Sequence, residues 1–201
     1  KKIKKIGLIN NDISLKVQSQ YEENPYPRWR YGNVSSKQKL NATQIINNEI
    51  KPNLIRSDLI NIQPQVLVAG CGTGNQILQA QRYSKVEIKA IDISTSSLSY
   101  SQRKIYELKF NNIDLIQMDL LNVKLLEKKF DIILCSGVLH HMKNPLKGLK
   151  ALLDCLKPGG FLKLGLYSEL ARRDIVKARE YIKANQLPAN DEGIKRFREN
   201  V

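Results

Sequence analysis

Short apolar runs alternate with longer polar segments through the middle of this chain. The runs occupy residues 66–69, 86–91, 113–118, 130–135 and 161–167. Nearly continuous apolar runs of this length are typical of strands buried on both faces of a parallel sheet. The segments between them are long enough for crossover helices. The pattern predicts an α/β domain.

Helix signals fall between and after these runs. Helices are predicted to begin near Asn75, after Asp92 over Ser94–Tyr100, and at Asn144–Pro145, where an N-cap residue precedes proline. The last of these is predicted to run through Leu156, and 157–160 to turn into the fifth strand. Beyond it, periodic apolar positions predict two more helices, over 169–184 and 191–198, and no further strand.

Three glycines on alternating positions follow the first strand. Gly70, Gly72 and Gly74 allow a tight turn and a close approach to a ligand, and a helix N-terminus after them favours an anionic group. A dinucleotide fingerprint has the spacing G-x-G-x-x-G, whereas this chain has G-x-G-x-G. The spacing favours S-adenosylmethionine, and a glycine-rich turn that serves packing alone is the alternative.

Two acidic residues follow the next two strands. Asp92 lies about twenty residues after the glycines, where a carboxylate can accept hydrogen bonds from both ribose hydroxyls. It is alternatively a helix N-cap. Asp119 ends the third strand. Because ligands of open parallel sheets bind outside the carboxyl ends of the strands, Gly70, Asp92 and Asp119 are expected to meet in one crevice.

The fourth strand opens into Ser136-Gly137-Val138-Leu139-His140-His141-Met142. With this loop, the order of the glycine loop, Asp92, Asp119, FDIILCSGVLHHM and LKPGGFLKL resembles the class I S-adenosylmethionine-dependent methyltransferases, over about Gln65–Tyr167. The resemblance implies a three-layer Rossmann-like fold with the sheet order 3-2-1-4-5. The cofactor-binding residues that we assign on this basis are Gly70, Cys71, Gly72, Thr73, Gly74, Asp92, Ile93, Asp119, Leu120, Ser136 and Gly137.

The resemblance gives these residues distinct roles. The glycines lie under the methionine and ribose, Asp92 binds the ribose hydroxyls, Asp119 lies near the adenine amino group, and Ser136-Gly137 lie beside the methionine end. One departure is Ala69, because the family usually has an acidic residue at this position. This departure and the lack of a final strand hairpin keep a noncatalytic, methyltransferase-like binding module open. An NAD-dependent oxidoreductase is disfavoured by the glycine spacing.

His140 and His141 are the only histidines. They are candidate catalytic residues, since the usual pKa of histidine lies near 6.5 and an acceptor that carries a proton needs a base. The alternative is that one of them packs or caps the next helix. No metal site is expected, because side chains of adjacent residues point apart.

An aromatic and proline-rich segment, 20–31, precedes the sheet. Its prolines hold the backbone extended. We expect it to lie over the crevice and assign Tyr26, Arg28, Trp29, Tyr31 and, from the end of the fifth strand, Tyr167 to the substrate side. The alternative is a strap that buries its own rings on the surface. The segment is similar to one in bacterial methyltransferases fused to tetratricopeptide repeats, which implies repeats upstream.

The composition of the chain limits the cellular compartment and the classes of substrate that are expected. The chain has 201 residues, 42% hydrophobic, with no membrane-length apolar run and no signal peptide, and it begins with Lys1, as a fragment would. Three cysteines without a CxxC pair favour a reducing cytoplasm over a disulfide framework or zinc site. The net charge of +14 is spread along the chain, so a nucleic-acid substrate is a minority alternative.

We therefore predict three parts: an N-terminal extension over 1–36, an S-adenosylmethionine-binding core over 37–167, and a helical insertion or lid over 168–201, with the domain cut short after Val201. The predicted function is methyl transfer from S-adenosylmethionine to an unidentified small-molecule or protein acceptor. A noncatalytic module and an RNA methyltransferase are the alternatives.

Overall fold

The computed structural model describes residues 2–32, 39–56, 60 and 62–200. The chain divides into two compact units, Lys1–Leu166 and Tyr167–Val201. The predicted domain boundaries stay predictions, and the first of them, at 36–37, lies outside the described residues. Among the described residues, no helix has both the length and the apolar character that crossing a membrane requires.

The first unit is built on a parallel sheet whose order is β1-β4-β3-β2-β5-β6 in the described residues. The strands are β1 Lys4–Lys5, β2 Gln65–Ala69, β3 Glu87–Asp92, β4 Ile113–Gln117, β5 Phe130–Ser136 and β6 Leu156–Gly165. From β4 to β6 this is the predicted order 3-2-1-4-5, so the predicted fold class is confirmed. The strand β1 was not predicted and adds one edge to the sheet.

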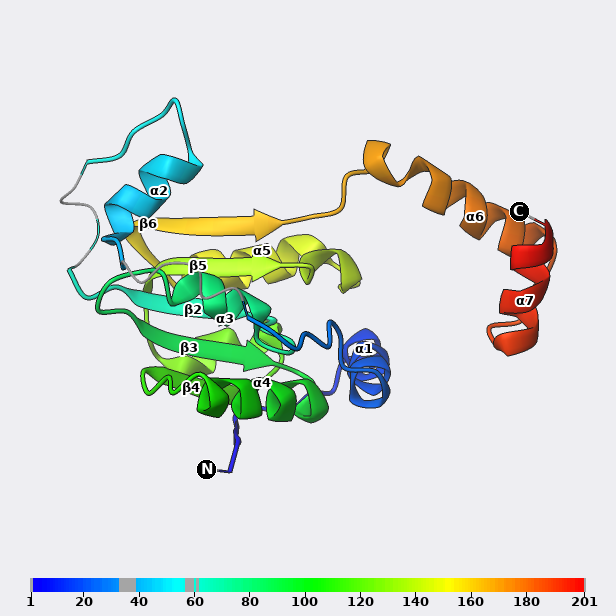
Figure 1. The fold of residues 1–201 in the computed structure, drawn as a ribbon, viewed down its shortest axis with the longest axis horizontal. Helices are drawn as coiled ribbons and strands as arrows, with labels where there is room; N and C mark the ends of the chain where they lie inside the picture. Colours follow the sequence, from blue (N-terminus) through cyan, green and yellow to red (C-terminus); the bar gives the residue numbers. More distant parts are fainter. Residues whose placement is uncertain (1, 33–38, 57–59, 61, 201) are drawn as a thin grey trace. The chain divides into compact units, whose positions relative to one another are not determined.

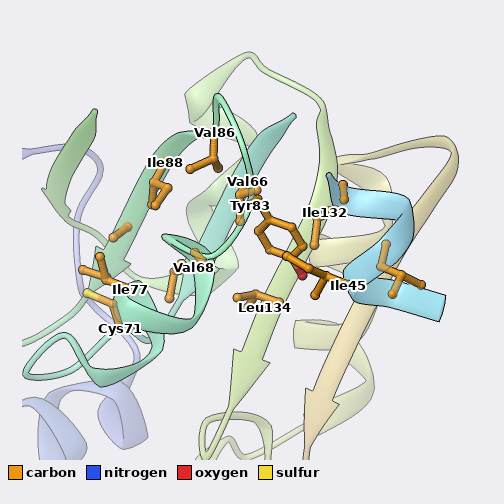
Figure 2. Packing of buried hydrophobic residues seen from close by; sticks show 14 of the residues in the cluster. Ile45, Val66, Val68, Cys71, Ile77, Tyr83, Val86, Ile88, Ile132 and Leu134 are labelled. Atoms are coloured by element: carbon orange, nitrogen blue, oxygen red, sulfur yellow. The ribbon is translucent and has the colours of Figure 1, made fainter. Parts of the chain in front are cut away.

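Each face of the sheet is covered by helices because the strand residues alternate between two cores. Val66 and Val68 of β2 pack in one core with residues of α2 (Ala42–Glu49), α3 (Asn75–Ala80) and α4 (Thr95–Glu107). Figure 2 shows Tyr83 and Ile45 packed beside Ile132 in this core. The other core joins Leu67 and Ala69 to α5 (Pro145–Asp154) and the 3-10 helix Leu120–Leu126.

The helix α1 (Asp12–Glu23) lies beyond the carboxyl ends of the strands (Figure 1). Asn11 caps it by accepting hydrogen bonds from the N–H groups of Ile13 and Ser14 at 3.0 and 3.2 Å. No side chain of α1 is fully buried, and several polar side chains of the helix make hydrogen bonds to the rest of the unit. These contacts belong to the site described below.

One predicted turn is wrong. The helix α5 starts at Pro145, capped by Asn144 as expected, but it ends at Asp154 rather than Leu156. The segment Lys157–Gly160 belongs to β6, which pairs with β5 from Leu156 onward through an irregular register. Proline and glycine are tolerated here because β6 is the edge of the sheet, where one side of the backbone needs no partner strand.

The second unit is helical in its described residues, with a short 3-10 turn Leu170–Arg172, α6 (Arg173–Ala184) and α7 (Asp191–Asn200). The single helix predicted over 169–184 is thus divided at Arg172–Arg173. The rings of Tyr181 and Phe197 lie 6.0 Å apart and join α6 to α7. The Arg172 guanidinium lies 3.7 Å from the centre of the Tyr167 ring. No strand follows Gly165 in the described chain.

Candidate functional site

The glycine turn between β2 and α3 has left-handed backbone at all three glycines. The φ angles are +72° at Gly70, +51° at Gly72 and +98° at Gly74, a region that favours glycine. A Cβ atom at Gly70 would lie 2.1 Å from Cγ2 of Val138, and one at Gly74 would lie 2.7 Å from Oγ of Ser101. At Gly70 and Gly74, both the left-handed backbone and the lack of space for a Cβ atom therefore require glycine.

Asp92 ends β3 and faces this turn. Its carboxylate accepts hydrogen bonds from the N–H groups of Gly72 at 2.8 Å and Ser94 at 2.9 Å. Burial raises the pKa of Asp92 despite these hydrogen bonds, and the negative charge of Glu22 raises it further. The cap of α4 is Ser94, whose hydroxyl accepts from the N–H of Ser97, so Asp92 is not the residue that caps that helix. Its carboxylate is left with capacity for further donors.

Asp119 follows β4 at the same end of the sheet. It is 5% exposed and caps the 3-10 helix by accepting a hydrogen bond from the N–H of Leu121 at 2.9 Å. The neighbouring Leu120 is buried. At the end of β3, the carbonyl of Ile93 accepts from the side-chain amides of Gln18 and Gln117. The two acidic side chains thus follow adjacent strands, β3 and β4, as the sequence predicts.

The carboxyl end of β5 closes the other side of the glycine turn. Ser136 and Gly137 are exposed, and a Cβ atom at Gly137 would meet no heavy atom within 4 Å. The side-chain amide of Gln76, in the first turn of α3, donates to the carbonyl of Ser136 at 2.8 Å. Sequence reasoning missed Gln76, because its partner lies sixty residues away and no local pattern indicates it.

A second group that the sequence did not indicate lies on α1. Gln18 donates to Ile93 O, Ser94 Oγ donates to Tyr21 O, and Glu22 accepts from the backbone N–H groups of Thr95 and Ser96 at 2.6 and 2.9 Å. Burial opposes ionisation of Glu22, but the hydrogen bonds from Ser96 and Thr95 prevail and lower its pKa. The helix is therefore fastened to the turn that follows Asp92.

The aromatic segment after α1 lies against the glycine turn. The Trp29 indole N–H donates to Thr73 O at 3.2 Å, and Thr73 Oγ1 donates to Pro27 O at 2.6 Å. The Tyr100 hydroxyl donates to Trp29 O. The side chains of Tyr26 and Tyr31 are 73% and 92% exposed, and Arg28 is exposed.

The structure thus brings Trp29 to the glycine turn, and Tyr26 reaches the same turn through its backbone carbonyl, 3.6 Å from a Cβ position built on Gly72. Tyr167 belongs to the second unit and is described only within it. The assignment of these residues to the substrate side stays a prediction.

His140 and His141 form the 3-10 turn Leu139–His141 after β5. Their ring centres lie 4.4 Å apart, and the ring of Tyr21 on α1 lies 6.4 Å from that of His141, edge to face. The pair therefore lies at the same end of the sheet as the glycine turn, next to α1. In the part of the chain that the structure describes, no group of three or more metal-ligating side chains occurs.

The cysteines near the turn are suited to packing. Cys71 and Cys135, near the turn, and Cys155, between α5 and β6, are buried free thiols. Burial raises the pKa of Cys135 to about 12, and burial together with the charge of Asp92 raises that of Cys71. Because the thiolate is the reactive form, neither thiol is a nucleophile at neutral pH.

Comparison with known proteins agrees with this geometry. Residues 66–160 match the family model of a methyltransferase domain. An uncharacterized protein of Synechococcus sp. is 39% identical over 122 residues, which is 60% of this chain and 29% of that protein. This chain therefore spans less than a third of that relative.

Two solved structures are similar. One is PKMT2 from Rickettsia typhi in complex with AdoHcy (S-adenosylhomocysteine), with a TM-score of 0.54 and 26% sequence identity. The match covers 61% of this chain and 24% of the PKMT2 chain. The other is magnesium protoporphyrin IX methyltransferase from Synechocystis with bound S-adenosylhomocysteine, with a TM-score of 0.57 and 19% sequence identity. The match covers 92% of this chain and 87% of that one. The family match over residues 66–160 and these two structures agree with the methyltransferase-like fold of the first unit.

Proposed function

We propose that this chain transfers the methyl group of S-adenosylmethionine to a small-molecule or protein acceptor, and that the cofactor binds at the carboxyl ends of β2, β3, β4 and β5. The observation that carries the proposal is the arrangement around the glycine turn. Asp92 lies on one side of the turn and Ser136 on the other, because β2 lies between β3 and β5 in the sheet. An extended ligand with a diol and an amino-acid end matches this spacing of acceptors.

The chemistry of Asp92 fits a ribose. A partly buried carboxylate with a raised pKa is stabilised by added donors, and two vicinal hydroxyls supply them. The glycines allow the backbone to approach the ligand, and the open space at Gly137 leaves room beside the end of β5. Gly70–Gly74, Asp92–Ile93, Asp119–Leu120 and Ser136–Gly137 are the segments that would hold the cofactor.

The cofactor, when bound, supplies a methyl group that is already activated on a sulfonium. The residues of this chain then have to orient the acceptor in line with that methyl and exclude water. Where the acceptor carries a proton, His140 or His141 is the proposed base, because both lie beside α1 at the carboxyl ends. Trp29 and the segment around it are proposed to close the substrate side.

A cytoplasmic location is proposed from the three buried free thiols, which suit a reducing compartment. An association with tetratricopeptide repeats stays a prediction from the similarity of residues 20–31.

Calorimetric titration tests the proposal. S-adenosylhomocysteine is expected to bind and NAD is not. The Asp92→Ala variant should lose about 1.5 to 3 kcal/mol of binding free energy, the scale of hydrogen bonds to a charged group. Unchanged affinity in that variant would refute the ribose assignment.

Methyl transfer from labelled S-adenosylmethionine is then measured on protein, small-molecule and RNA fractions of a cell extract. Label in the protein or small-molecule fraction supports the proposal. Label in RNA alone identifies an RNA methyltransferase, and binding without transfer to any fraction identifies the noncatalytic module.

A further inference from the structure

The side chain of Gln76 contains a buried acceptor at the edge of the proposed cofactor site. Its Nε2 donates to the carbonyl of Ser136 at 2.8 Å, which joins the first turn of α3 to the end of β5. Its Oε1 is buried and accepts no hydrogen bond from the described residues. Because a buried carbonyl without a donor is unfavourable, this oxygen is suited to a donor that arrives from outside the chain.

The orientation of the amide follows from its partner. A carbonyl oxygen only accepts hydrogen bonds, so the group that faces Ser136 O must be the NH₂ of Gln76. Turning the amide over would set two acceptors against each other. The free group of Gln76 is therefore the oxygen.

Position in the sheet indicates which part of the cofactor meets this oxygen. Asp92 lies on the β3 side of the glycine turn, whereas Gln76 is tied to β5, on the other side of β2. If the ribose binds Asp92, the amino-acid end extends toward Ser136 and Gln76. Val68 and Ala69 end β2 with fully buried apolar side chains, so this strand offers no carboxylate to an ammonium group.

We propose that Gln76 Oε1 accepts a hydrogen bond from the α-ammonium group of S-adenosylmethionine and so serves in place of an acidic side chain at the end of β2. Gln76 then selects ligands that carry an amino group at this end. The inference rests on the proposed function, since it requires that the cofactor binds with its ribose at Asp92.

The test uses the Gln76→Met variant, whose side chain has a similar length but no amide, and three ligands. These are S-adenosylhomocysteine, its analogue without the amino group, and 5′-methylthioadenosine, which lacks the whole amino-acid end. Gln76→Met should weaken S-adenosylhomocysteine about tenfold, the loss expected for one hydrogen bond to a charged group. The affinities for the other two ligands should change less than about twofold.

The control is Gln79→Met, the same exchange at an exposed position of α3, which should leave all three affinities unchanged. Thermal unfolding of each variant checks that the fold is retained, and an unchanged affinity for 5′-methylthioadenosine checks that the adenosine side of the site is intact.

Three outcomes would overturn the inference. An equal loss for all three ligands would mean that Gln76 only shapes the turn. A loss for the deaminated analogue as large as for S-adenosylhomocysteine would mean that Gln76 donates from its NH₂ group to the carboxylate instead. An unchanged affinity for every ligand would also exclude the contact. Absence of S-adenosylhomocysteine binding in the unmodified chain would instead contradict the proposed function itself.

Discussion

Two aspartates on the neighbours of β2 have opposite surroundings. Asp131, near the amino end of β5, is 4% exposed and accepts from Lys157 Nζ at 2.9 and 3.0 Å and from the N–H of Gln65 at 2.8 Å. Asp92, at the carboxyl end of β3, accepts from backbone N–H groups, and the charge that acts on it from α1 is another carboxylate, that of Glu22. The carboxylate of Asp131 is paired with a cation of its own chain, whereas that of Asp92 accepts hydrogen bonds from backbone N–H groups and is the one proposed to bind a ligand.

This difference separates the two ends of the sheet. Near the amino end of β5, the charge of Asp131 is paired with that of Lys157. At the carboxyl ends, a carboxylate with a raised pKa, left-handed glycines and a buried unpartnered amide oxygen lie together. Such features are unfavourable for folding alone and are typical of sites that bind ligands.

The largest effect is expected for Asp131→Ala. Removing one partner of a buried pair leaves Lys157 without its counter-ion and Gln65 N–H without its acceptor, so the free energy of unfolding should fall by about 3 kcal/mol in urea titration. The affinity for S-adenosylhomocysteine should remain within about twofold, since Asp131 lies at the opposite end of the sheet.

Asp114→Ala is the control for this change, because Asp114 pairs with Lys89 while its own side chain is 70% exposed. The loss of unfolding free energy in Asp114→Ala should stay below about 1 kcal/mol. If Asp131→Ala cost no more free energy of unfolding than the control, the buried pair would contribute no more than an exposed one.

Alanine substitution should destabilise the two glycine turns at the carboxyl ends to different extents. Gly70→Ala adds a clash with Val138 to an unfavourable φ of +72° and should lower the free energy of unfolding by about 3 kcal/mol. Gly137→Ala keeps a positive φ of +76° in open space, so about 1 kcal/mol is expected from the backbone alone. Chemical denaturation compares them, and equal losses would show that packing at Gly70 is unimportant.

Glu22→Gln tests how α1 is fastened. Loss of the charged acceptor for Thr95 and Ser96 N–H should cost about 1 kcal/mol at pH 7, the usual worth of a helix cap. The lowered pKa of Glu22 means that its contribution is present above pH 4.5, the unfolded value, and is lost as the pH falls through the folded value.

The difference in stability between Glu22→Gln and the unmodified chain should therefore disappear in acid. Glu23→Gln, the same exchange at an exposed neighbour, should leave the free energy of unfolding at pH 7 unchanged. A Glu23 effect as large as that of Glu22 would indicate a general charge effect rather than the cap.

The smallest effect is expected at the aromatic segment. Trp29→Phe removes the hydrogen bond to Thr73 O and should cost about 0.5 to 1 kcal/mol in unfolding free energy. If the segment closes the site, adding S-adenosylhomocysteine should protect residues 24–31 from proteolysis, less so in the variant. If the rate of proteolysis is the same with and without S-adenosylhomocysteine, the segment lies outside the site.

The sequence predicted the features that depend on local patterns. Apolar runs identified β2 to β5, and the glycine spacing and strand ends identified Asp92 and Asp119. The two-residue β1 has no apolar signature, because Lys4 and Lys5 pair through the backbone alone. The contacts of Gln18, Glu22 and Gln76 join residues sixty or more positions apart, so only the folded chain shows them.

The proposed division of roles is that Asp92 binds the ligand and Asp131 stabilises the fold. It is tested most directly by measuring S-adenosylhomocysteine affinity and unfolding free energy for Asp92→Asn and Asp131→Asn together at pH 7. We predict that Asp92→Asn weakens binding at least about tenfold with little loss of stability, and that Asp131→Asn lowers stability with little change in binding. Similar losses of both quantities in both variants would contradict the account.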